Sequence, residues 1–212
     1  AFLMIIGVPI AISIGVSSAL ILLSAMPFHV ALSTAGQKMV NGIDSFSLLA
    51  VPLFIMAGNI MNHGGIARRL VDFAYLFVGK IPGSISHVNV VANMLFGTVS
   101  GSAVAAVAAV GKTLLPEAKK AGMDIPLFTA ANIASGPTGQ IIPPSNGMIV
   151  YSVVSGGTSI GALFLAGYLP GIIMGLCSMI VVAIYLKIHP QWAGKNPEIK
   201  LSFSKVINVI WR

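Results

Sequence analysis

The stretch IPLFTAANIASGPTGQIIPPSNGMIVYSVVS, residues 125–155, decides how this chain folds. Its two ends are apolar and helix-forming, whereas its centre, residues 135–147, collects glycine, proline, serine and asparagine. Proline lacks an N–H and clashes with the preceding helical turn, so this centre predicts an unwound segment between two half-helices. No charged residue lies between Ile125 and Lys187, so we expect this discontinuous helix to be membrane-embedded. The alternative is an extramembrane loop between two short segments.

The composition also indicates a membrane protein. Of the 212 residues, 56% are hydrophobic and only 8% are charged, whereas a soluble domain carries roughly 25% charged residues. The mean hydropathy is +0.94, and 23 glycines with 12 prolines suit membrane helices that contain breaks. We therefore predict an all-α polytopic membrane protein.

Residues 84–116 form a second stretch that is too apolar for a loop. The segment 98–102, Thr-Val-Ser-Gly-Ser, divides it into two arms of about 15 residues, each roughly 22 Å long and short of a full span. Lysines flank both ends, so both ends belong on one side of the membrane. This pattern predicts a re-entrant helical hairpin whose tip lies buried in protein or beside a polar cavity. The alternative is one long, kinked spanning helix.

The first third of the chain predicts shorter helices. The Gly7-Val8-Pro9 step is expected to break or kink the apolar run 1–25. Residues 27–46 suit an interfacial helix, and residues 47–62 suit a hydrophobic helix interrupted at Pro52.

Residues 66–79 alternate charged and bulky apolar side chains at helical spacing. This predicts an amphipathic helix at the membrane surface. The alternative is the water-exposed end of an ordinary transmembrane helix. The expected polar side holds Arg68, Arg69 and Asp72, and the expected apolar side holds Leu70, Phe73, Ala74 and Phe77.

Residues 159–186 predict a spanning segment in which Pro170 separates a short leading helix from the main span. Cys177 lies inside this run and is expected to be a small packing residue. With one cysteine and four scattered histidines, the sequence gives no support to a metal cluster.

The expected organisation has four parts. Residues 1–80 supply scaffold and arm helices, residues 81–158 the transport elements, residues 159–188 a transmembrane helix, and residues 189–212 a cytoplasmic linker with the start of another helix. Because the chain begins inside an apolar run with Ala1, we expect an excerpt of a longer protein.

Charge placement predicts the orientation. The net charge is +7, but Lys and Arg stand singly or in pairs at the edges of apolar runs, which excludes a nucleic-acid surface. With the hairpin ends placed inside, eleven of the twelve basic residues fall on the cytoplasmic side and only Lys38 lies outside.

A hairpin tip beside an unwound helix can build an ion and substrate site. Freed backbone carbonyls can coordinate Na⁺, and half-helix N-termini attract an anionic substrate group. Neither centre contains Asp or Glu, which argues against a proton relay. The candidate substrate-binding residues are Ser100, Ser102, Pro143, Ser145 and Asn146. The candidate Na⁺-binding residues are Ser100, Gly101, Ser102, Ser135, Gly136, Thr138 and Gly139.

Asn89 and Asn93 lie four residues apart and share one face of the first hairpin arm. They could face the candidate site, or they could form hydrogen bonds with a neighbouring helix.

Four ordered blocks, residues 48–74, 87–105, 141–157 and 163–172, resemble the large membrane subunit of tripartite ATP-independent periplasmic (TRAP) transporters. The resemblance implies a multi-pass protein of the bacterial inner membrane that imports an organic acid with a Na⁺ gradient. It also implies an elevator mechanism, a small four-helix membrane subunit (possibly fused) and a periplasmic substrate-binding protein. Substrates in the family include sialic acid, other sugar acids and C4-dicarboxylates.

The resemblance also assigns residues. Ser100, Gly101 and Ser102 match the family's hairpin tip, and the family's unwound segment matches Gly136, Pro137, Pro143, Pro144 and Ser145. Two positions depart from the pattern: Ala106 stands where many members carry Asp, and Asn146 where many carry an apolar residue. The family has two inverted repeats, and this chain resembles the first.

Three other functions compete with this one. A stand-alone Na⁺-coupled carboxylate carrier would use the same hairpin and unwound helix without a binding protein. An intramembrane hydrolase would need a base beside Ser100 or Ser102, and His87 lies about 20 Å away along a helix. A purely structural subunit would not need a proline-rich unwound helix in the bilayer. We therefore expect a transporter and no enzyme.

Overall fold

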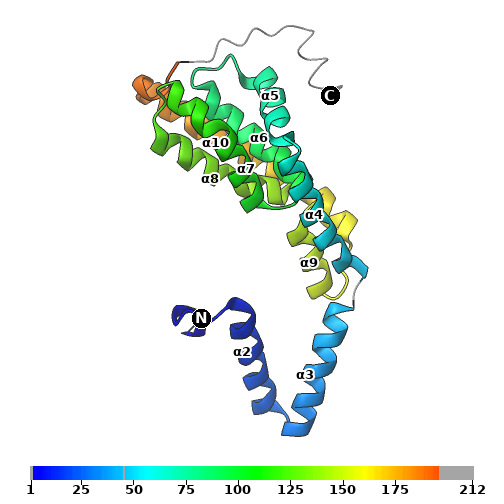
Figure 1. The fold of residues 1–212 in the computed structure, drawn as a ribbon. Coiled ribbons are helices and arrows are strands. Elements are labelled where there is room, and N and C mark those ends of the chain that lie inside the picture. The colour runs from blue at the N-terminus through cyan, green and yellow to red at the C-terminus, as the bar shows by residue number, and fades with distance from the viewer. Residues whose placement is uncertain (1, 45, 196–212) are drawn as a thin grey trace. The chain divides into compact units, whose positions relative to one another are not determined.

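The computed structural model describes residues 2–44 and 46–195, and every regular element within them is a helix (Figure 1). The predicted start of another helix, within residues 196–212, lies outside the described residues. The chain divides into two compact units, residues 1–48 and 49–212, which we describe separately. The predicted functional division at residue 80 stays a prediction.

The first unit contains three helices, α1 (Phe2–Ile5), α2 (Ile10–Ala25) and α3 (Phe28–Ile43). The predicted break after the first turn is confirmed, because Gly7 has a φ of +88° and Pro9 stands directly before α2. Pro27 likewise stands directly before α3, where a missing N–H removes no intrahelical hydrogen bond.

The 3₁₀ turn η1 (Phe46–Leu49) contains the boundary between the two units, and the second unit continues with α4 (Ala50–His63) and α5 (Ile66–Val78). The predicted interruption at Pro52 is wrong: Pro52 lies in the first turn of α4, where an N–H has no intrahelical acceptor. The predicted apolar side of α5 also needs correction, since Phe77 is 67% exposed. The helix buries Ala74, as predicted, together with Ala67, Val71, Tyr75 and Val78.

Five longer helices form a bundle around α6, which packs against α5, α7, α8 and α10 (Figure 1). Ser86 near the start of α6 lies 3.5 Å, Oγ to Sδ, from Met123 just after α7, so α6 and α7 run antiparallel as a helical hairpin. The single long helix considered as an alternative is therefore wrong. The elements that follow α5 in the chain are α6 (Ser84–Ser100), α7 (Ala103–Lys120), α8 (Ile125–Ile141), α9 (Asn146–Val154), α10 (Ile160–Ile188) and the 3₁₀ turn η2 (Pro190–Trp192).

Helix α10 runs unbroken for 29 residues, so the predicted separation at Pro170 is wrong. Gly167, Gly171 and Gly175 repeat every four residues and bury one side of α10 against the bundle, and this packing offsets the local cost of proline. Of the described helices, α10 alone is long and apolar enough to cross a membrane by itself; a second candidate arises only if residues 28–43 and 47–61 count as one bent span.

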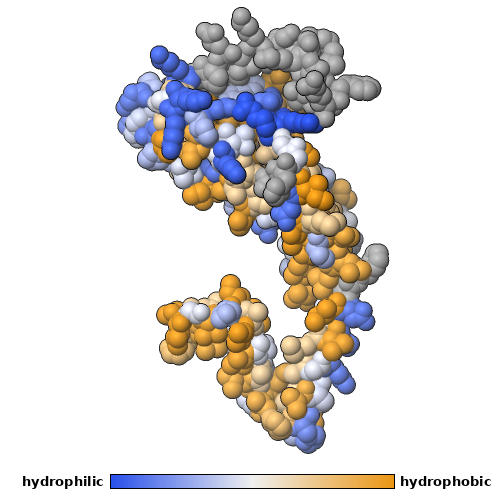
Figure 2. All heavy atoms as spheres, in the orientation of Figure 1, coloured by the Kyte–Doolittle hydropathy of each residue, from blue (hydrophilic) through white to orange (hydrophobic). Residues whose placement is uncertain are grey.

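The surface of the bundle is polar at one end and apolar elsewhere. Figure 2 shows hydrophilic side chains gathered around the end where α6 starts and α7 stops, while hydrophobic side chains cover the rest of this face. On α10, residues such as Leu165, Leu169 and Ile180 are more than half exposed, which suits contact with lipid rather than water.

A polar cluster fastens α5 to the end of α7. The Arg68 guanidinium forms an ion pair with Glu117 through its Nη1, and Tyr75 donates a hydrogen bond from its hydroxyl to Glu117 Oε2 at 3.2 Å. Burial, reinforced by the Glu117 carboxylate, raises the pKa of the Tyr75 hydroxyl. Tyr75 therefore stays protonated and keeps donating at physiological pH.

We expect this cluster to make a small, measurable contribution to stability. A double-mutant cycle with Arg68→Gln and Glu117→Gln should give a coupling of about 0.5–1 kcal/mol, because both side chains are partly exposed. The coupling should shrink as salt rises. Thermal unfolding of the complete subunit in detergent measures it, with the neighbouring exposed Arg69→Gln as control. A coupling of zero at low salt would contradict this assignment.

Candidate functional site

The first helix break lies at the hairpin tip and is narrower than predicted. Helix α6 continues through Thr98 and Val99 and ends at Ser100, so only Gly101 and Ser102 are non-helical. Gly101 has a φ of +62°, a left-handed conformation that glycine adopts without strain. Ser102 then caps α7, its Oγ accepting a hydrogen bond from the backbone N–H of Ala105 at 3.4 Å.

The second break lies between α8 and α9 and spans residues 142–145. It contains a cis peptide bond between Pro143 and Pro144. Ser145 caps α9, its Oγ accepting from the backbone N–H of Met148 at 3.3 Å. Both breaks therefore have the same build: a helix ends, the chain turns, and a serine opens the next helix.

The predicted unwinding of residues 135–139 is wrong, because α8 stays helical through Pro137 to Ile141. Close packing explains why this proline is tolerated. A Cβ added to Gly139 would lie 2.5 Å from the Gly97 Cα, and one on Gly136 would lie 2.4 Å from Val107 Cγ2. The glycines thus let α8 touch α6 and α7, and this contact offsets the roughly 3 kcal/mol that a helix-interior proline costs.

The two breaks meet. A Cβ built on Gly101 would lie 3.3 Å from both the backbone N and the Cγ of Asn146, so the hairpin tip touches the first residue of α9. Ser100 and Ser145 are almost fully buried in this contact region. Helix α4 also packs against the hairpin tip, since a Cβ on Gly58 would lie 3.4 Å from Ser100 Cβ.

Four helix ends therefore converge on one small region without any carboxylate. The ends of α6 and α8 contribute free carbonyl oxygens, and the starts of α7 and α9 contribute free N–H groups. Helix ends carry about half an elementary charge, negative at carbonyl ends and positive at N–H ends. The Asn146 Oδ1 atom is buried there without a hydrogen-bond partner. Such a region can hold a cation and an anionic group side by side.

The structure sorts the predicted site residues into two sets. Ser100, Gly101, Ser102, Pro143, Ser145 and Asn146 belong to the two breaks that meet. The other set lies within α8: Thr138 Oγ1 donates to the Ser135 carbonyl at 2.5 Å, and the Thr138 carbonyl accepts from Ile142 N–H at 2.9 Å. The set on α8 is Ser135, Gly136, Thr138 and Gly139, and its role in Na⁺ binding stays a prediction.

Buried amide side chains connect α6, α7 and α8 next to the site. Asn93 Nδ2 donates to Asn132 Oδ1 at 2.9 Å and to Ser135 Oγ at 2.8 Å, while Asn132 Nδ2 donates to the Val107 carbonyl at 3.1 Å. The interhelical interpretation of Asn93 is thus confirmed. Sequence reasoning missed Asn132, although a lone asparagine three residues before Ser135 in an apolar helix was the available signal.

A hydrolase gains no support from this geometry. Helix α6 is unbroken between His87 and Ser100, which places them about 20 Å apart along one axis. The two ring nitrogens of His87 are buried without a partner. Within the part of the chain that the structure describes, no three His, Cys, Asp or Glu side chains group together to hold a metal ion.

Discontinuous helices whose breaks face each other inside an apolar bundle recur in secondary transporters of the membrane. Residues 1–212 match the family model described as "Tripartite ATP-independent periplasmic transporter, DctM component". The chain belongs to this family of transporter permeases.

Three relatives illustrate the similarity. YgiK of Salmonella typhimurium, an uncharacterised protein, is 54% identical over 89% of this chain and 43% of its own length. YiaN of Escherichia coli, a 2,3-diketo-L-gulonate TRAP transporter large permease protein, is 41% identical over 97% of this chain and 48% of its own. SiaM of Vibrio cholerae, a sialic acid TRAP transporter large permease protein, is 42% identical over 69% and 34%. The chain spans less than half the length of these relatives.

Gly97→Ala should break the contact on which the site depends. Its Cβ would lie 2.0 Å from the Gly139 Cα, where no flexible side chain can yield, so we expect a loss of about 1–3 kcal/mol or more in thermal unfolding. The matched control is Gly36→Ala in α3, where a Cβ meets no atom within 4 Å and helix propensity favours alanine. Equal stability of the two variants would refute the close-packing argument.

Asn93→Ala should destabilise the bundle more than Asn89→Ala. Asn93 loses two short hydrogen bonds. Asn89 makes only long contacts: its Nδ2 donates to the Phe128 carbonyl at 3.5 Å, and its Oδ1 accepts from Asn93 Nδ2 at 3.4 Å. We expect about 1–2 kcal/mol for Asn93, the range for polar pairs between membrane helices. Unfolding of the two variants measures the difference. Adding Asn132→Ala and the double variant Asn93→Ala/Asn132→Ala completes a cycle, in which additive losses would argue against a shared network.

Proposed function

We propose that this chain is half of a Na⁺-coupled importer of an organic acid and that the two helix breaks form its part of the transport site. The observation that carries the proposal is the contact between Gly101 at the hairpin tip and Asn146 at the start of α9. It brings carbonyl ends and N–H ends of helices together in a region without acidic side chains. This is the combination that a cation and a carboxylate need when they travel together.

The free N–H groups at the starts of α7 and α9 suit the carboxylate of the substrate. Ser102 and Ser145 use their oxygens to cap these helices, so their hydroxyl protons remain to donate to the same anion. Asn146 and Pro143 form the rest of the proposed substrate contact. The names of relatives support an organic acid: sialic acid for SiaM, 2,3-diketo-L-gulonate for YiaN and C4-dicarboxylate for DctM of Vibrio cholerae.

The carbonyl-rich end of α6 suits Na⁺, a hard cation that prefers oxygen ligands. In this proposal the Ser100 and Gly101 carbonyls coordinate the ion. The Ser102 carbonyl, which accepts from the Ala106 N–H at 3.1 Å, would join them only after that hydrogen bond opens. The set on α8, residues 135–139, would contribute carbonyl ligands only after that helix loosens, because Ile142 N–H already occupies the Thr138 carbonyl.

The proposed setting is the bacterial inner membrane, with α6 and α7 as a re-entrant hairpin. Lysines at the open end of the hairpin support a cytoplasmic location of that end. The proposed mechanism is an elevator, in which the bundle carrying both breaks slides against a scaffold. A small four-helix membrane subunit and a periplasmic binding protein are the proposed partners, consistent with the family to which the chain belongs.

Uptake by the complete large subunit tests the proposal. Proteoliposomes that also contain the small subunit should accumulate labelled sialic acid or a C4-dicarboxylate only with an inward Na⁺ gradient and the cognate binding protein. Uptake that needs Na⁺ alone would favour the stand-alone carrier. Absence of uptake of any acid under any gradient would favour a structural subunit and remove the basis of the site.

Asn146→Asp is the sharpest single change for this experiment. It places a carboxylate where the α9 N-terminus is proposed to hold the substrate anion, and like charges in a dry site repel strongly. We expect at least a tenfold loss of uptake. Asn41→Asp makes the same chemical change at an exposed position of α3 and should leave uptake near the native level; a similar loss in both variants would contradict the assignment.

A further inference from the structure

An apolar groove of about 670 Å³ lies between α8 and α10, outside the two helix breaks. Residues spaced four apart line each wall, so the groove follows the helix axes. Small side chains on α8 create the hollow. Cys177, predicted to be a small packing residue, is exposed there and does not pack among the described helices. The lining includes Pro126, Ala130 and Ala134 on α8, and Ile173, Cys177 and Tyr185 on α10.

The length of the groove matches one leaflet of a bilayer. From Ile173 to Tyr185 the wall on α10 rises by twelve helical steps, or about 18 Å, whereas the hydrocarbon core of a bilayer is about 30 Å thick. Helix α10 is also the described helix that can span a membrane by itself. A straight apolar channel of this length on a spanning helix fits one acyl chain.

One end of the groove carries the aromatic rings typical of a membrane–water boundary. The rings of His189 and Trp192 stack with centroids 4.0 Å apart, and Tyr185 stacks on Trp192 at 6.4 Å. Asp124 N–H donates to the Trp192 carbonyl at 3.2 Å and so fixes this aromatic cluster against the start of α8. The headgroup level of the membrane is therefore expected at this end.

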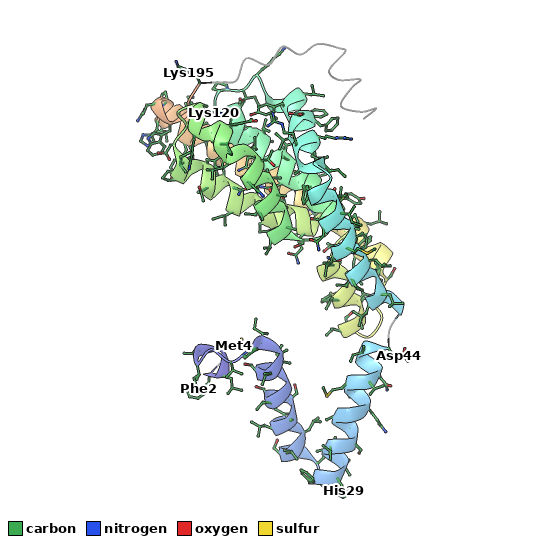
Figure 3. The ribbon with its side chains drawn as sticks, viewed as in Figure 1. Phe2, Met4, His29, Asp44, Lys120 and Lys195 are labelled. Atoms are coloured by element: carbon green, nitrogen blue, oxygen red, sulfur yellow. The ribbon has the colours of Figure 1, made fainter. Side chains whose placement is uncertain are left out.

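The same end is cationic. Lys195 N–H donates to the Ala121 carbonyl at 2.8 Å, which brings Lys195 beside the end of α7, and Figure 3 shows Lys120 at the same end of the bundle. Asp124 is the acidic residue in the lining, and its carboxylate accepts from Leu127 N–H at 2.8 Å. Among the residues that the structure describes, four exposed lysines gather here without an ion pair: Lys119, Lys120, Lys187 and Lys195.

We propose that the groove binds one acyl chain of an anionic phospholipid, whose phosphate contacts the lysines at the aromatic end. The apolar walls of the groove would bury the acyl chain, and the lysines would favour a negatively charged headgroup over a neutral one. Each lysine near an anionic headgroup contributes about fivefold in affinity. This site is separate from the proposed transport site and does not depend on it.

The test uses the complete large subunit with its small subunit in phosphatidylcholine nanodiscs. A trace of phosphatidylglycerol with a photoactivatable acyl chain is added, and labelled peptides are identified by mass spectrometry. We expect labels within 126–134 and 173–185. Lys187→Gln/Lys195→Gln should raise the lipid concentration at half-saturation about 25-fold. Lys38→Gln/Arg69→Gln, the same charge change on α3 and α5, should leave it unchanged. Ala134→Trp should fill the groove and abolish labelling there without altering charge.

Three results would overturn the proposal. Labelling that does not distinguish phosphatidylglycerol from photoactivatable phosphatidylcholine would exclude a preference for anionic lipid. Labelling that persists in Ala134→Trp would place the chain outside the groove. A cross-link from Cys177 to another segment of the full-length protein, with no lipid label, would show that protein fills the groove.

Discussion

The contact between Gly97 on α6 and Gly139 on α8 is the constraint on which the rest of the bundle depends. At this point two helix backbones touch, because neither residue has a side chain to hold them apart. The contact lies one turn before the end of α6 and two residues before the end of α8. It therefore fixes both helix ends at one level, so that the segments that follow them must meet. The hydrogen bond between the buried amides of Asn93 and Asn132 joins the same two helices one turn earlier in α6 and about two turns earlier in α8.

The sequence predicts the positions of the breaks better than their extent. Gly101 between two serines marks the hairpin tip correctly, because a left-handed residue and a serine cap are local requirements. Pro137 and Pro170 were expected to end helices, yet both lie inside them. Each proline destabilises its own helix locally. The packing that offsets this cost involves nearby glycines that contact residues distant in the sequence, as Gly171 contacts Ile142. Composition alone does not reveal those contacts.

The sequence also did not predict correctly which side chains of a helix are buried. For α5 the charged side was recognised, but Tyr75 rather than Phe77 turned out to be buried. Tyr75 is buried because its hydroxyl reaches Glu117 on α7, a partner 42 residues away. Asn132 was not predicted as a buried polar residue because its partners, Asn93 and Val107, lie on other helices. Periodicity locates a face, whereas the identity of the neighbouring helix decides which residues fill it.

The shared build of the two breaks has a consequence for how membrane voltage would act on a carrier of the proposed kind. Each break sets the negative end of one helix beside the positive end of the next, and these partial charges nearly cancel. No ionised side chain lies in residues 97–103 or 138–147. An empty site of this build adds no net charge to the moving body, whereas each ion it takes up feels about 2.3 kcal/mol per 100 mV. Voltage would then drive the loaded half of the cycle whenever the bound Na⁺ ions exceed the negative charges of the substrate, and it would leave the return step unaffected.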